Sequence, residues 1–250
     1  MRRLAVLPLA AATIVLAGCP KLTVTPQLAP SPQGPPKLIW AGNSAGYAIR
    51  WTNIDISAVP LRKSGGQVLT ELGLTIFDLH RASQMQTGDC DFVRVARLQS
   101  VVGPIISIAD DDTMKCANGA TGAYRKTVAI DLRHPGTPAL LSDYFPAHEL
   151  GSLALRVARV CPSRPENLLN GFAFDQLQGS AVTVAVALPS ACSESTVKVA
   201  LNVPPGLRDA LELAARKRQG FLLKDQPAVS KGQTTTINYQ YRVGNPSLNM

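Results

Sequence analysis

A serine in a glycine-rich pentapeptide is the motif in the chain most typical of an enzyme. Residues 42–46 read Gly-Asn-Ser-Ala-Gly and match G-x-S-x-G, the turn that presents the nucleophile of serine hydrolases. That turn requires a helix directly after the serine, whereas here the following residues alternate as in a strand. His134 and His148 could supply a base, but nothing in the sequence marks either one. The pattern favours a glycine-rich hairpin turn, and a hydrolase that uses Ser44 is the alternative.

A second reactive group is the thiol of Cys19, which closes an apolar segment at the N-terminus. Two arginines follow Met1, and residues 4–16 are apolar over about the length of a secretory signal, too short to span a bilayer. Residues 16–19 read Leu-Ala-Gly-Cys and resemble the lipobox of bacterial lipoproteins. The resemblance implies a diacylglyceryl thioether on Cys19, cleavage before it and acylation of the new amine. The alternative is an ordinary signal peptide with an incidental cysteine.

Such an anchor would place the protein in the cell envelope. Each buried methylene contributes about 0.8 kcal/mol, so two or three acyl chains hold a protein where one chain would dissociate. Pro20 follows the cysteine, and the aspartate that resembles an inner-membrane retention signal is absent from that position. We expect attachment to a membrane through the N-terminal lipid, with the outer membrane favoured where the cell has one.

The other four cysteines are expected to form disulfides. Cys90, Cys116, Cys161 and Cys192 would lie in an oxidising compartment, and four cysteines allow three connectivities. None belongs to a C-x-x-C pair and no histidine is close in sequence, so a zinc site is not expected. We favour sequential pairing, Cys90 with Cys116 and Cys161 with Cys192, because each bridge then closes a local excursion between strands.

Three consecutive acidic residues, Asp110 to Asp112, raise the question of a calcium site. The glycine and the terminal glutamate of an EF-hand loop are missing around them. An exposed acidic turn is the simpler interpretation. We expect no metal ion and no cofactor.

Composition limits the partners. The net charge of +8 falls to +6 when Arg2 and Arg3 leave with the signal, and the densest basic run is Arg216-Lys217-Arg218. So thin a spread of positive charge indicates a mildly basic surface and not a stripe that binds nucleic acid. The polyanions of a cell envelope are anionic lipid headgroups and wall polymers. Aromatic residues make up only 5% of the chain, which argues against a carbohydrate-stacking groove.

The elements that would position these residues follow from periodicity and turn signals. Six prolines in residues 20–36 predict an extended tether of up to about 50 Å. Residues 92–102 and 105–108 fit one bent strand or a hairpin equally well, and the state of the apolar segment 68–79 is left open. A helix should follow residues 141–145, capped by Ser142 or Asp143. Further strands are expected at 37–41, 47–59, 124–132, 172–175, 181–188, 196–203 and 234–243, and a second helix at 205–218, capped by Gly220.

These elements predict an α+β fold, mostly antiparallel sheet with two amphipathic helices, in a single globular domain of two halves. The expected divisions are a lipoprotein signal peptide at 1–18, the lipidated cysteine and tether at 19–36, a β-rich half at 37–91 and an α+β half at 92–243.

The second half also resembles a known family. Residues 100–108, a glycine loop at 118–120, the strand 128–132 and the segment Leu-Ser-Asp-Tyr-Phe at 141–145 resemble the extracellular domain shared by the anti-sigma factor RsiV and the deacetylase PdaC. The resemblance covers roughly residues 92–222. It implies an α+β fold and, for RsiV, lysozyme recognition, with no chemistry at this domain. The family's Gly-Gly-Ala-His loop is here Asn-Gly-Ala-Thr, without the histidine.

The expected function is that of a lipid-anchored envelope lipoprotein with a non-catalytic binding domain. Its ligand would be an anionic envelope component, an envelope polymer or protein, with nucleic acid excluded by the location. Like charge argues against lysozyme as the partner, because typical lysozymes are also strongly basic. The alternatives are the hydrolase that uses Ser44 and a purely structural lipoprotein.

Overall fold

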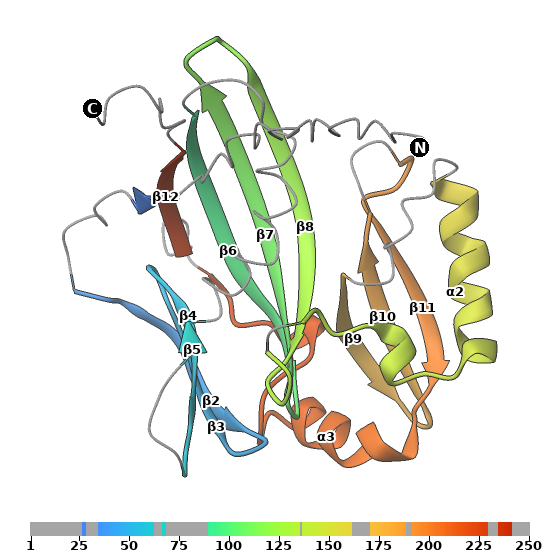
Figure 1. Ribbon diagram of the computed structural model, residues 1–250. Coiled ribbons are helices and arrows are strands. Elements are labelled where there is room, and N and C mark those ends of the chain that lie inside the picture. The colour runs from blue at the N-terminus through green and yellow to red at the C-terminus, as the bar shows by residue number, and fades with distance from the viewer. Residues whose placement is uncertain are drawn as a thin grey trace, which may run out of the picture.

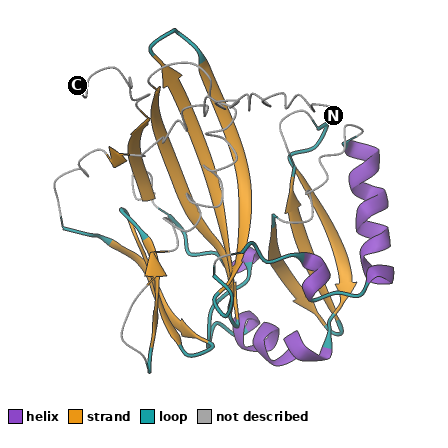
Figure 2. Ribbon diagram, in the orientation of Figure 1, coloured by secondary structure: helices purple, strands orange, loops and turns teal. Residues whose placement is uncertain are grey.

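A computed structural model describes residues 27–28, 35–62, 67–68, 90–135, 137–161, 171–188, 192–229 and 235–241. In this part of the chain the strands form three antiparallel sheets, accompanied by two α-helices and two short 3-10 helices (Figures 1 and 2). The fold is therefore α+β and mostly antiparallel sheet, as predicted. The expected signal peptide at 1–18, Cys19 and the segment 69–89 lie outside the described residues.

The largest sheet is built on one long meander. Strands β6 (Cys90–Val102), β7 (Ile105–Cys116) and β8 (Thr121–Asp131) are joined by tight turns, so residues 92–108 are a hairpin and not one bent strand. Gly103 supplies the positive φ of 56° that the first turn requires. Strand β12 (Thr235–Tyr241) pairs with β6, and β1 (Gln27–Leu28) pairs with β12, which gives the order β1-β12-β6-β7-β8.

Strand β1 lies within the segment expected to be a tether. Gln27 pairs with Gln240 and Leu28 with Tyr239, so the expected tether over 20–36 contains two residues of the central sheet. A tether of about 50 Å would require all of residues 20–36 to be free of the sheet. The pairing leaves a much shorter link between Cys19 and the sheet.

Near the β6–β7 turn this sheet is buried on both faces. Successive residues of a strand point to opposite faces, so each face packs against a different part of the domain. One face packs against a small sheet of β2 (Leu38–Ser44), β3 (Tyr47–Thr52), β4 (Ile56–Pro60) and β5 (Gln67–Val68). Ile49 and Trp51 of β3 meet Val101 and Ile106 of the central sheet in a shared core. The indole N–H of Trp51 donates to Thr235 Oγ1 at 2.8 Å, which ties this sheet to β12.

The opposite face packs against the remaining elements. Strands β9 (Phe172–Gln178), β10 (Ala181–Ala187) and β11 (Thr196–Asn202) form a three-stranded sheet, with helix α2 (Ala147–Val160) along β11 and helix α3 (Pro205–Ala215) at the end of β6 (Figure 1). Helix α2 buries Leu150, Leu153 and Val157, at the i, i+3, i+7 spacing of one helix face. Two 3-10 helices, η1 (Leu141–Asp143) and η3 (Leu223–Asp225), complete this side.

The end of α3 differs from the prediction. The helix stops at Ala215, and Lys217, with φ of 56°, takes the left-handed conformation after it. Gly220 does not cap the helix. A Cβ on Gly220 would lie 2.1 Å from the carbonyl oxygen of Val101, so this glycine allows two backbones to come into contact.

Candidate functional site

Ser44 is the last residue of β2 and its side chain is buried, with 1% of the residue exposed. The turn after it consists of Ala45 and Gly46 alone, both at positive φ, as in a two-residue hairpin. Ser44 Oγ donates to the carbonyl oxygen of Gly103 at 2.8 Å. The serine thus ties the β2–β3 hairpin to the β6–β7 turn.

The histidines lie apart from this serine in the bonding pattern. His134 follows β8 in a turn, where its carbonyl accepts from Thr137, and exposed His148 on α2 lies 3.7 Å from Glu149. Among the described residues no histidine hydrogen-bonds to Ser44. The geometry that a general base needs is therefore not seen in this part of the chain.

The three consecutive aspartates do not form an exposed turn. They lie inside strand β7, where Asp110 is 3% and Asp112 6% exposed. Asp110 forms a two-pronged ion pair with Arg94 of β6, a residue that is itself only 2% exposed. Arg94 Nε also lies 3.8 Å from Asp112. The interpretation as an acidic turn is wrong, because an arginine on the neighbouring strand compensates the carboxylates.

Asp111 points to the other face of the sheet, where it bridges two arginines. It pairs with Arg97 of β6 and, at 2.8 Å, with Arg125 of β8. The alternation of strand side chains thus splits the acidic run between two faces. Among the described residues no group of three ligands is arranged to hold a metal ion.

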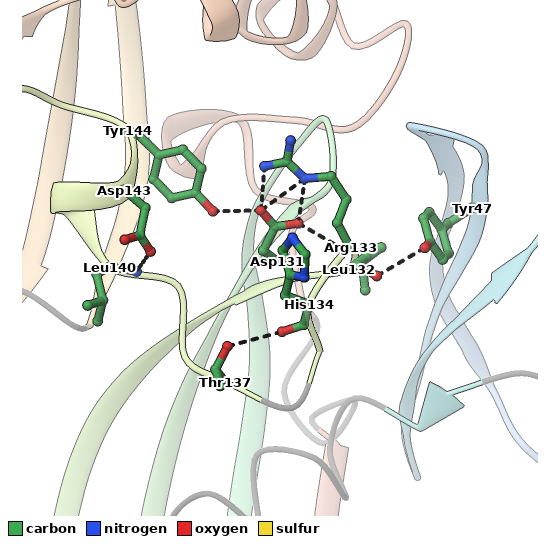
Figure 3. Close-up of polar contacts among 9 residues, drawn as sticks. All are labelled: Tyr47, Asp131, Leu132, Arg133, His134, Thr137, Leu140, Asp143 and Tyr144. Carbon is green, nitrogen blue, oxygen red and sulfur yellow. Dashed lines mark hydrogen bonds and ion pairs between the residues drawn. The ribbon is translucent and has the colours of Figure 1, made fainter.

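A polar cluster closes the end of β8 (Figure 3). The carboxylate of Asp131 accepts from the side chain of Arg133, from its backbone N–H at 2.9 Å, and from Tyr144 Oη at 2.8 Å. Tyr47 Oη of the small sheet donates to the carbonyl of Leu132 at 3.0 Å. Segments from three parts of the chain are joined here.

This cluster stabilises the ionised carboxylate of Asp131. Burial alone would raise the pKa of Asp131, but the hydrogen bonds from Arg133 and Tyr144 outweigh it and hold the pKa below its ordinary value of 3.8. Burial, and then the bond to Asp131, raises the pKa of Tyr144 above its ordinary 10.0. The cluster therefore holds a carboxylate ionised and a phenol neutral, which is the state that braces the loop.

Sequence reasoning did not single out Asp131, Arg133 or Tyr144. Asp131 ends β8 and Arg133 lies in the turn after it, where an aspartate that accepts from the N–H two residues on is a usual turn signal. This signal is weak because such turns are common. No sequence rule indicates that Tyr144 would reach the same carboxylate.

The Leu-Ser-Asp-Tyr-Phe segment forms η1 and does not cap α2. Leu141 and Phe145 are buried in the core, and Asp143 Oδ2 accepts from the N–H of Leu140 at 2.9 Å. Pro146 precedes α2, which begins without a side-chain cap. The expected capping by Ser142 or Asp143 is wrong, because the carboxylate turns back to its own short helix.

Both disulfides have the predicted sequential pairing. Cys90–Cys116 joins β6 to β7 directly across the ladder, and Cys161–Cys192 joins the end of α2 to the segment before β11. The bridges therefore use the four cysteines other than Cys19, and the chain contains five.

Some exposed cations are paired with carboxylates of the domain and others are not. Arg216 pairs with Glu212 and Lys217 with Asp225, so the basic run after α3 is partly neutralised. Arg218 is exposed, as are Arg156 and Arg159 on α2, and within the described residues no carboxylate lies within ion-pair distance of these three. These three are open to an outside partner.

Comparison of the chain with protein-family models, with curated proteins and with solved structures finds no match. Within the described residues no helix is both long and apolar enough to cross a membrane.

Proposed function

We propose that the protein is a lipid-anchored lipoprotein of the cell envelope whose folded domain binds an anionic envelope component without catalysing a reaction. The observation that carries the proposal is the use of the cysteines. Four of the five are joined in two disulfides, so the thiol of Cys19 has no cysteine left in the chain to pair with. That one thiol follows the signal-like segment, where a lipidation enzyme would use it.

The two disulfides support the location. The chain has one disulfide between neighbouring strands and one after a helix. Disulfides persist in oxidising compartments and are rare in the reducing cytosol. A secretory signal at residues 1–18 would deliver the chain to such a compartment. The outer membrane is the favoured destination in a cell that has one, because Pro20 follows the cysteine.

Charge supports the binding role. Many carboxylates of the described residues are already engaged, as Asp110 is by Arg94 and Asp131 by Arg133, while Arg156, Arg159 and Arg218 are open. Internal neutralisation of the acids leaves the surplus of positive charge to the solvent. Such a surface attracts polyanions weakly, and the attraction fades beyond the Debye length of about 8 Å at physiological salt.

The burial of Ser44 supports a non-catalytic role. Its hydroxyl donates to a backbone carbonyl and a strand follows it, whereas a nucleophile elbow is exposed before a helix.

The proposal includes the division into halves at 37–91 and 92–243 and the RsiV-like character of the second half. The segments on which that resemblance rests lie in β6 to β8 with their turns and in η1.

Metabolic labelling tests the anchor. Cells that express the full chain are fed a fatty acid carrying an alkyne, and the purified protein is examined for label. We expect label on the wild-type chain and none on Cys19→Ala, with Ser44→Ala as a matched control that keeps the label. Equal labelling of wild type and Cys19→Ala would refute the proposal.

Calorimetry tests the ligand class. The chain from Pro20 onward is titrated with a glycerol-phosphate polymer, with neutral phosphatidylcholine vesicles and with lysozyme. We expect weak binding to the polymer, lost between about 0.05 and about 0.3 M salt, and none to the other two. The double variant Arg156→Ala/Arg159→Ala should bind the polymer more weakly. Tight, salt-resistant binding to lysozyme would contradict the proposal and favour the RsiV-like partner.

A further inference from the structure

One row of paired residues crosses the whole central sheet. Gln27 of β1 pairs with Gln240, Gln240 with Asp91, Asp91 with Lys115, and Lys115 with Thr121. Strand β1 therefore belongs to the same row of pairs as Thr121, the first residue of β8. We call the β7–β8 turn, residues 116–121, and the adjoining Cys90–Cys116 bridge the hairpin end of the domain.

Strand direction shows from which side the chain enters. β1 is antiparallel to β12, and β12 is antiparallel to β6, so β1 runs in the direction of β6. Strand β6 starts at the hairpin end and runs toward Gly103. Strand β1 therefore begins, at Gln27, on the side of the hairpin end.

The opposite end of the sheet carries α3. A Cβ on Gly103, in the β6–β7 turn, would lie 3.1 Å from Ala210 of that helix, so helix and turn are in contact. We call this the helix end. It holds Arg218 just beyond α3, whereas at the hairpin end Asp91 and Lys115 stand opposite each other on β6 and β7 and the turn from Ala117 to Ala120 is uncharged.

The link from Cys19 to the sheet is shorter than the sheet and α3 together. From Cys19 to Gln27 there are eight Cα–Cα steps, which cannot span more than about 29 Å in any conformation. From Lys115 to Ile105, ten residues of β7 extend over about 33 Å, and α3 adds about 10 Å of helix thickness. A domain standing on its helix end would hold Gln27 more than 40 Å from the bilayer, beyond the reach of a lipid on Cys19.

We infer that the hairpin end faces the anchoring bilayer and that the helix end, with Arg218, is presented away from it. The inference rests on the proposed lipidation of Cys19 and narrows the ligand class. Cations near α3 would then meet an anionic polymer of the envelope, and not the headgroups of the membrane that holds the protein.

A proximity measurement tests this orientation without depending on lipidation in the cell. The chain starting at Cys19 keeps its two disulfides, so its single remaining thiol is coupled to a maleimide lipid in phosphatidylcholine vesicles. p-Acetylphenylalanine replaces exposed Ala120 in one sample and exposed Arg218 in another, and each ketone is given a fluorophore. The vesicles contain a lipid with a nitroxide on its headgroup, which quenches only at short range.

We expect loss of fluorescence at position 120 and none at position 218. Equal quenching at both positions, or stronger quenching at 218, would overturn the inference. As a control, twelve glycine and serine residues inserted between Thr25 and Pro26 should relieve the quenching at 120. Failure of fatty-acid labelling in cells would count against the anchor alone, because the maleimide lipid replaces it here.

Discussion

Val101 and Phe221 exchange two backbone hydrogen bonds, with N–O distances of 2.9 and 3.0 Å, although they lie far apart in the sequence. This bridge fixes the chain after α3 onto β6. It brings Gly220 so close to the carbonyl of Val101 that no side chain fits between them.

Gly220→Ala should therefore destabilise the fold strongly. The left-handed backbone and the collision with Val101 together cost on the order of 3 kcal/mol. Gly179→Ala is a matched control, since Gly179 also has a positive φ but faces open space, and should cost about 1 kcal/mol. Urea denaturation measures both free energies of unfolding. Equal losses would show that the contact with Val101 is unimportant.

Arg94→Met should destabilise the protein by about 3 to 5 kcal/mol, because it leaves the buried carboxylate of Asp110 without its main partner. Arg97→Met is the control on the opposite face of the same strand, where the pair with Asp111 is partly exposed and is worth at most about 1 kcal/mol. The double variant Arg94→Met/Asp110→Leu should recover part of the loss. If Arg94→Met costs no more than Arg97→Met, the buried pair is not important for stability.

Tyr144→Phe should cost about 2 kcal/mol near neutral pH, because it removes a hydrogen bond to the ionised carboxylate of Asp131. The folded-state pKa of Asp131 lies below 3.8, so this contribution is complete above that pH and fades as the pH falls through the folded value. The difference between wild type and variant should shrink below about pH 4.

Tyr47→Phe provides the matched control for that pH dependence. Tyr47 donates to the backbone carbonyl of Leu132, which does not titrate, so its loss of about 1 kcal/mol should not change in the same range. Denaturation curves at several pH values decide the matter. A loss for Tyr144→Phe that stays constant with pH would argue against the ionised acceptor.

Ser44→Ala should lower the free energy of unfolding by about 1 kcal/mol, because the partly buried carbonyl of Gly103 loses its donor. Hydrolysis of a p-nitrophenyl ester by the purified chain should be the same before and after the substitution. A clear activity that disappears with Ser44 would establish the hydrolase instead.

Alternation and turn signals predicted much of the sheet from the sequence. Strands β2 and β9 to β11 fall close to the expected ranges. The single strand expected at 47–59 is wrong, because a turn in which Thr52 bonds to Asp55 divides it into β3 and β4. The first disulfide could be placed because Cys90 and Cys116 end the two strands of one hairpin and meet across its ladder, whereas Cys161 and Cys192 lie after α2 and before β11.

Charged residues were the main source of error. Asp110 to Asp112 have the composition of a surface turn, and their burial depends on Arg94, whose neighbouring position follows only from the register of β6 and β7. Gly220 has the same difficulty. A glycine after a helix is typical of a cap, and nothing local indicates the contact with Val101 that requires it.

The position of β12 affects how the domain assembles. This strand pairs with β6 on one side and β1 on the other, so segments from both ends of the printed sequence meet in one sheet. About 130 residues separate the end of β6 from β12, so β6 gains this neighbour only through a long-range contact. Until that contact forms, the edge of β6 is unpaired and Trp51 lacks the hydroxyl of Thr235. The partly folded domain therefore exposes an open strand edge that a chaperone of the envelope could shield until β12 docks.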